Sequence, residues 1–173
     1  MGDLSRHFSR SEFACHCKNP RCEGKVGFVV DPLLIIGLEE LRESIRRGNN
    51  RSHSRIRVRV ISGVRCADHD RACNEVNKKA GYRARTNSTG QHFLGAAADV
   101  VVEVDRGPAW EAIPPEVVVA YAEECPVWQD GRGGIGHGIG NAVHLDVRGG
   151  KGARWNYASK GGQEKRSEAV EDR

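Results

Sequence analysis

Apolar residues recur with a helical period near the start of this chain. The segment "DPLLIIGLEELRESIRR" repeats leucine and isoleucine at the three- and four-residue spacing of one helical face. Asp31 suits the N-cap, and Pro32 suits the first helical position. This pattern predicts a helix over 32–47.

Elsewhere the pattern changes to alternation or to short apolar runs, which predict strands. "RIRVRVIS" at 55–62 alternates apolar residues with arginines, "AAADVVVEV" at 96–104 is an apolar run, and "AVHLDVRG" at 142–149 gives a last strand. Two more helices are predicted, over 67–79 with a cap at Gly81 and from about 115 in "PPEVVVAYAEEC". The glycine-rich "DGRGGIGHGIGN" is expected to bend the chain into the last strand.

Size and composition favour one folded domain. The chain has 173 residues, of which 38% are hydrophobic, enough for a single core. We expect a domain over 1–157 that includes a cysteine-rich loop at about 13–27, and a disordered polar tail over 158–173. The formal net charge of +4 would suit an anionic partner or an ordinary solvated surface, and it does not choose between them.

The N-terminus "MGDLSRHFSRSEF" lacks the apolar segment of a signal peptide, and the apolar runs are too short to cross a bilayer. We therefore expect synthesis in the cytoplasm without a signal peptide and no membrane insertion. Any action outside the cell, in the periplasm or on the wall, would follow release by lysis or delivery by a phage particle.

Three of the six cysteines crowd into "CHCKNPRC". Cys15, Cys17 and Cys22 could hold a structural zinc ion if a fourth ligand came from elsewhere, and a reduced loop without metal is the alternative. The remaining cysteines are expected to be small buried residues. They are Cys66, Cys73 and Cys125.

A second set of possible ligands lies around the predicted strands. His92 precedes Asp99 by seven residues, and His144 stands in the last strand. Three nitrogen and oxygen donors are the composition of a catalytic zinc site, which keeps one position open for water. The metal would also supply the charge that a carboxylate at the start of an apolar strand needs. On these residues alone, a turn cap at Asp99 and an ordinary strand face at His144 remain alternatives.

Five segments, in this order and spacing, resemble the M15-type zinc D,D-peptidases, most closely the small branch of bacteria and their phages. They are "HFSRSEFAC", "VDPLLIIGLEELR", "ISGVRCADHD", "GQHFLGAAADV" and "AVHLDVRGGKGARW". The resemblance implies a hedgehog/D,D-peptidase-like α+β fold, with a central antiparallel sheet flanked by helices and a zinc cleft. It assigns one zinc ion to His92, Asp99 and His144, and it places Arg65 beside the metal.

Candidate catalytic groups follow from this assignment. Arg65 could bind a substrate carboxylate or stabilise an oxyanion. Asp146 is the first candidate for the general base or acid, because strand alternation gives it the same face as His144. His137 is the second candidate, either as an acid or as a group that orients the tetrahedral intermediate. Relatives commonly have serine where this chain has Gly90, so substrate contacts are expected from neighbouring residues instead. The candidates are Ser88, Thr89 and Gln91.

The expected function is hydrolysis of amide bonds in the stem or cross-link peptides of bacterial peptidoglycan, by a D,D-carboxypeptidase or an endopeptidase, such as a phage endolysin. A monomer is expected, although no motif sets the oligomeric state. The alternative is a non-catalytic, zinc-stabilised binding module for the cell wall or a protein partner, as in hedgehog-type domains. Nucleic-acid binding through a cysteine zinc knuckle is disfavoured, because aromatic residues make up only 6% of the chain.

Overall fold

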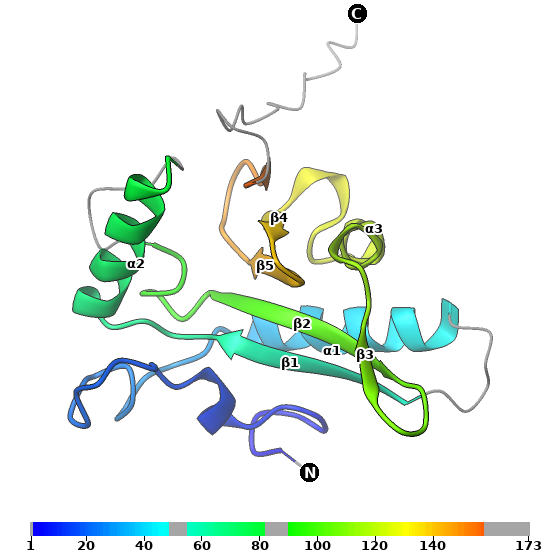
Figure 1. Ribbon diagram of the computed structural model, residues 1–173, viewed down its shortest axis with the longest axis horizontal. Coiled ribbons are helices and arrows are strands. Elements are labelled where there is room, and N and C mark those ends of the chain that lie inside the picture. Colours follow the sequence, from blue (N-terminus) through cyan, green and yellow to red (C-terminus); the bar gives the residue numbers. More distant parts are fainter. Residues whose placement is uncertain (1, 49–54, 82–89, 158–173) are drawn as a thin grey trace, which may run out of the picture.

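A six-stranded sheet lies at the centre of the computed structural model, which describes residues 2–48, 55–81 and 90–157 (Figure 1). Together with the helices around it, the sheet forms a single α+β domain, as the sequence predicts. The described elements are, in chain order, η1 (Arg10–Phe13), α1 (Pro32–Gly48), β1 (Ile56–Ser62), α2 (Ala67–Lys79), β2 (Ala97–Asp105), β3 (Trp110–Ala112), α3 (Pro115–Glu124), η2 (Gln129–Gly131), β4 (Gly134–Ile139), β5 (Ala142–Asp146) and β6 (Ala153–Asn156).

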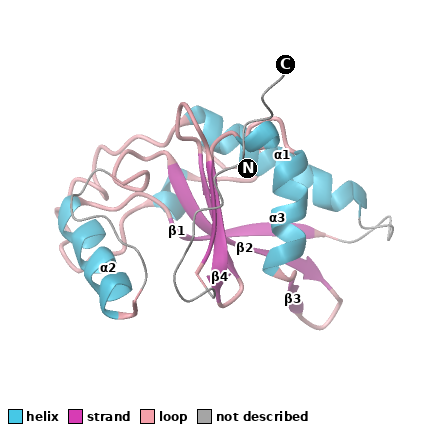
Figure 2. Cartoon of the chain, turned by 90° about the horizontal axis from the view of Figure 1, so that it is seen from above, coloured by secondary structure: helices cyan, strands magenta, loops and turns pink. Residues whose placement is uncertain are grey.

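The strand order is β1-β2-β5-β4-β6, and β3 pairs with the C-terminal end of β2. Figure 2 shows β4 crossing the direction of β2, as the twist of a sheet produces. The prediction of an antiparallel sheet is wrong at one edge, because β6 runs parallel to β4. The chain leaves β5 through a connection over 147–152 that returns it to the start of β4, so β6 repeats the direction of β4.

The two faces of the sheet carry different residues. One face is apolar and packs against α1 and α3, and it includes Val100 and Val102 of β2 and Leu145 of β5, all buried. The opposite face carries Asp99, whose register partner in β5 is His144. Strand alternation therefore separates the core from the polar residues that the sequence singles out.

The helices begin largely where their caps predict. In α1, the backbone N–H of Leu33 donates to the Asp31 carboxylate at 2.9 Å, which satisfies one of the free donors of the first turn. Helix α2 is followed by Gly81 at φ +83°, a conformation that glycine adopts without strain. Figure 1 shows α2 beyond the end of β1, while α1 runs behind β1 and β2.

Much of the glycine-rich segment is a strand, which the sequence pattern did not predict, and the predicted bend into the last strand is limited to residues 140–141. β4 pairs with β5 on one side and with β6 on the other. Two of its glycines are required by their neighbours: a Cβ atom on Gly134 would lie 2.2 Å from the Asp146 carboxylate, and one on Gly136 would lie 2.2 Å from Trp155. Because glycine has a low intrinsic propensity for strands, the residue pattern along the chain does not predict β4.

The sequence also missed β3, β6 and the two 3-10 helices, all of which are three or four residues long. The last predicted strand is shorter than expected and ends at Asp146 rather than at Gly149. Within the described residues, no helix combines the length and the apolar character needed to cross a membrane. The expected polar tail, 158–173, lies outside the described residues.

Candidate metal centre

The three predicted zinc ligands lie together. His92 belongs to a turn over 91–95 that leads into β2, and Asp99 and His144 face each other across β2 and β5. His92 Nε2 is 3.2 Å from Asp99 Oδ1 and 3.1 Å from His144 Nδ1, and His144 Nδ1 is 2.8 Å from Asp99 Oδ1. The alternatives of a turn cap at Asp99 and an ordinary strand face at His144 do not account for this convergence.

Hydrogen bonds behind the two rings fix which nitrogen faces the centre. His92 Nδ1 donates to the carbonyl oxygen of Gly63 at 2.6 Å, because a carbonyl can only accept. His144 Nε2 donates to Asp146 Oδ2 at 3.1 Å. Each histidine thus presents its other nitrogen to Asp99, in the arrangement that orients metal-bound histidines.

The three groups of the cluster shift one another's pKa. Burial lowers the pKa of His92, and the Asp99 carboxylate only partly opposes this effect. Burial acts to raise the pKa of Asp99, but the two histidines outweigh it and hold that pKa well below its usual range. For His144, burial acts to lower the pKa, but hydrogen bonds to Asp146 and Asp99 raise it to about 9. Without metal, a proton on His144 therefore balances the charge of Asp99 together with the Arg65 guanidinium, and a metal ion would take the place of that proton.

The spacing of the three atoms fits a metal ion. Ligands at about 2.0–2.1 Å around tetrahedral zinc lie about 3.3 Å apart, close to the 2.8–3.2 Å seen here. Among the described residues, no fourth histidine, cysteine, aspartate or glutamate joins His92, Asp99 and His144 in this group. The side chains of Asp99 and His144 keep 21% and 13% of their surface exposed, so the cluster reaches solvent on one side.

Arg65 lies beside the cluster, where the resemblance places it. Its Nη2 donates to Asp99 Oδ2, its Nε donates to Ser62 Oγ at 2.9 Å, and its backbone N–H donates to the His92 carbonyl at 3.1 Å. The side chain is 15% exposed. A guanidinium held in this way combines a fixed position with partial access to solvent.

Asp146 is more enclosed than a free base would be. It is 0% exposed, and Arg148 holds both of its oxygens, with Nε 2.9 Å from Oδ1 and Nη2 2.6 Å from Oδ2. Burial acts to raise the pKa of Asp146, but Arg148 and His144 lower it far below the usual range. The carboxylate therefore stays ionised and supports His144 from behind.

The other catalytic candidate, His137, lies in β4 opposite Asn156 of β6. The preceding residue, Gly136, is the one that faces His144. The register of β4 with β5 shifts between Gly136 and Ile139, so His137 lies in an irregular part of the strand, where alternation does not assign its side chain to one face of the sheet.

The substrate-binding candidates are only partly described. Ser88 and Thr89 lie outside the described residues. Gln91 is half-buried in the turn that carries His92, and its carbonyl accepts from the backbone N–H of Ala96 at 2.9 Å.

Three further residues, to which the sequence patterns assign no role, lie near the candidate metal centre. They are Arg148, Trp155 and Tyr157. The ring of Trp155 lies 5.1 Å from that of His144, and the ring of Tyr157 lies 6.1 Å from that of Trp155. Arg148 stands over Trp155 at 5.5 Å as well as holding Asp146. The RW pair at 154–155 belongs to a segment quoted for the resemblance, but the contact with His144 depends on β6 pairing with β4.

The cysteine cluster has four members, which completes the incomplete set predicted from the sequence. Cys66, expected only to fill space, joins Cys15, Cys17 and Cys22, and one Sγ atom from each lies within 4.8 Å of the others. Burial raises the pKa of the Cys22 thiol to about 12, and the Cys17 and Cys15 thiols add to that increase. Of the other two cysteines, Cys125 is buried as expected and Cys73 is only half-buried.

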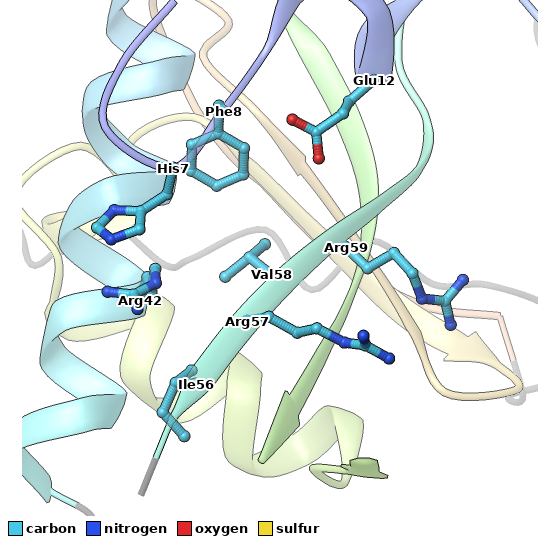
Figure 3. A pocket seen from close by; sticks show the side chains of 8 residues that line it. All are labelled: His7, Phe8, Glu12, Arg42, Ile56, Arg57, Val58 and Arg59. Atoms are coloured by element: carbon cyan, nitrogen blue, oxygen red, sulfur yellow. The ribbon is translucent and has the colours of Figure 1, made fainter. Parts of the chain in front are cut away.

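A pocket of about 330 Å³ lies away from this chemistry (Figure 3). It is formed between the N-terminal segment, α1 and the edge strand β1, and none of the predicted site residues lines it. The residues around it are His7, Phe8, Glu12, Arg42, Ile56, Arg57, Val58 and Arg59. The pocket therefore adds nothing to the assignment of the metal centre.

Comparisons with protein-family models, with curated proteins and with solved structures find no match to this chain.

Proposed function

We propose that the protein is a zinc-dependent peptidase that hydrolyses amide bonds in the stem or cross-link peptides of bacterial peptidoglycan. One observation carries the metal part of this proposal. Two histidines, each held from behind by a hydrogen bond, direct their remaining nitrogens at the same carboxylate oxygen. Such a convergence suits a divalent cation better than any pairing among the three groups.

The donor set favours catalysis over a purely structural ion. Three nitrogen and oxygen ligands leave a coordination position open, whereas structural zinc sites are closed by four protein ligands. When bound there, zinc would lower the pKa of a coordinated water towards about 7 and polarise a carbonyl group. The residues of the chain then have to orient the ligands and bind the substrate.

Arg65 and Asp146 take different parts in this proposal. Arg65 is the group that would contact substrate, because its guanidinium lies at Asp99 and can pair with a carboxylate or with a developing oxyanion. Asp146 is a positioning residue for His144, because accepting a proton would cost it the hydrogen bonds from Arg148 and His144. This assignment replaces the role of general base that the sequence first suggested for Asp146.

The substrate class rests on the resemblance of the five segments to the M15-type peptidases. The ring of Trp155 next to His144, with the ring of Tyr157 against Trp155, is compatible with an aromatic surface on which a peptide could pack. Both a carboxypeptidase and an endopeptidase fit this arrangement, and a phage endolysin or a cellular wall enzyme would use the same site.

The test is mass spectrometry of purified peptidoglycan and its muropeptides after incubation with the protein. We expect new amino and carboxyl termini that disappear on chelation and return when zinc is added. His144→Ala should abolish cleavage, because it removes one ligand of the centre. His7→Ala is the matched control, since that histidine pairs with Glu39 outside the centre and the variant should cleave normally. Cleavage that survives chelation would contradict the proposal.

The second candidate is a non-catalytic binding module that keeps the metal for stability. It is favoured by the enclosure of Asp146, which leaves the first predicted base with both oxygens engaged. Binding to insoluble peptidoglycan, with zinc retained and no new termini in several wall chemistries, would support this candidate over the peptidase.

A further inference from the structure

The four clustered cysteines lie apart from the main hydrophobic core. Cys15, Cys22 and Cys66 are buried, Cys17 is packed against them, and none of the four forms a disulfide. One Sγ atom from each lies within 4.8 Å of the others. Thiolates at about 2.3 Å around a tetrahedral ion are about 3.8 Å apart, so a small contraction of the cluster would complete a zinc site.

The loop that carries three of these cysteines has no helix or strand over residues 14–31. Instead, its backbone folds around the thiols. The N–H of Cys15 donates to the Gly24 carbonyl at 2.7 Å, and the Cys22 carbonyl accepts from the N–H of Lys25 at 2.9 Å. Gly24 lies so close to the cluster that a Cβ atom there would be 2.7 Å from the Cβ of Cys15. A metal ion bound by the thiols would cross-link this loop at its centre.

The fourth cysteine comes from a distant part of the chain. Cys66 occupies the N-cap position of α2, and no side-chain hydrogen bond caps that helix there. Its backbone N–H donates to Cys15 Sγ at 3.4 Å. The partial positive charge at the start of a helix favours thiolates, which are the form of cysteine that binds metal.

We propose that Cys15, Cys17, Cys22 and Cys66 bind one structural Zn²⁺ ion, which fastens the N-terminal loop to the start of α2. Four sulfur ligands close the coordination sphere, so this ion would have no open position for water. It is distinct in ligand type and in purpose from the ion of the candidate metal centre.

The position of Cys66 links this structural ion to the candidate metal centre, a consequence that rests on the proposed function. The segment 63–66 supplies the Gly63 carbonyl that holds His92 and the Arg65 guanidinium that contacts Asp99. A structural ion at Cys66 would steady both contacts from the end of that segment.

The experiment measures zinc per chain in the full-length protein and in the His92→Ala/His144→Ala double variant. The double variant removes the catalytic centre, so its zinc reports on the cysteines alone. We expect two zinc ions per wild-type chain and one per double-variant chain. A thiol-specific mercurial should release that remaining ion, and the amount of zinc released should rise in proportion to the number of thiols modified, up to four. This result is independent of any hydrolysis, and failure of the proposed function would leave it unchanged.

Cys66→Ser, added to the double variant, should lose the remaining ion, whereas Cys73→Ser should keep it, because Cys73 lies in the same helix outside the cluster. Cobalt added to the metal-free double variant gives a second measurement that needs no cysteine variant, because four thiolates produce strong sulfur-to-cobalt charge-transfer bands. A double variant that folds without binding metal, or that contains disulfides among these cysteines, would overturn the proposal.

Discussion

At the scale of single residues, the candidate centre depends on groups one step behind the ligands. The Gly63 carbonyl and the Asp146 carboxylate fix the rings of His92 and His144, and Arg148 in turn holds Asp146. Such partners set both the orientation and the basicity of a ligand, so their loss weakens metal binding without removing a ligand.

Asp146→Asn should therefore reduce zinc affinity about 10- to 100-fold while the fold is retained. The amide keeps the size of the carboxylate but loses its charge opposite His144 and Arg148. Competition with a chelator of known affinity measures the change. Asp68→Asn is the control, because the Asp68 side chain is 90% exposed and should leave affinity unchanged. Unaltered affinity with lost turnover would instead make Asp146 the general base.

At the scale of elements, helix α1 packs against the core through a glycine. Gly37 lies against the indole of Trp128, which is 0% exposed and donates from Nε1 to the Asp146 carbonyl at 2.8 Å. The helix thus approaches the segment between α3 and β4 closely, at the one glycine within α1 before Gly48 at its end.

Gly37→Ala should destabilise the protein, because the added Cβ would lie 2.6 Å from the Trp128 ring. Overpacking costs about 1–3 kcal/mol, and the better helix propensity of alanine offsets about 1 kcal/mol of this cost. We expect a net loss of about 1 kcal/mol in the free energy of unfolding, measured by urea denaturation. Gly149→Ala, where a Cβ meets nothing within 4 Å, should change stability far less. Equal stability of the Gly37 variant and wild type would mean that α1 can shift away from Trp128.

At the scale of the whole molecule, charges on the polar face of the sheet tie strands together. Glu103 of β2 accepts from Arg57 at 2.7 Å and from Arg59 at 3.3 Å, both in β1. Arg57 also lies over the ring of Trp110 at 4.3 Å, which extends the contact to β3. Burial acts to raise the pKa of Glu103, but the two arginines outweigh it, so the pKa is lowered.

A lowered pKa in the folded state makes the contribution of Glu103 depend on pH with a definite sign. The stabilisation is fully present above the unfolded pKa of about 4.3 and is lost as pH falls through the lower folded value. Glu103→Gln should therefore cost about 1 kcal/mol at pH 7 and progressively less below pH 4. Urea unfolding of variant and wild type across this range measures the difference. Glu111→Gln, at a side chain that is 64% exposed, should show a smaller effect. A cost that stays constant with pH would exclude an electrostatic origin.

Local sequence patterns were sufficient to predict most of the helices and the long strands. The helices beginning at Pro32, Ala67 and Pro115 and the apolar strand before Asp105 agree with the structure, because periodicity and capping act within a few residues. The sequence also predicted that His92, Asp99 and His144 lie together. The structure confirms that they do and that they could hold a metal ion. The identity of the ion and the reaction stay predictions.

Contacts between residues distant in sequence became apparent only from the packing of the folded chain. Cys66 reaches the loop of Cys15 because β1 returns the chain beside the N-terminal segment, and no spacing rule spans that separation. The segment of β4 is a strand because it pairs with β5 and β6, and its glycines leave room for Asp146 and Trp155. Arg148 encloses Asp146, the first candidate for general base, and this contact is the reason for proposing that Asp146 supports His144 instead. Long-range packing, rather than local propensity, sets each of these features.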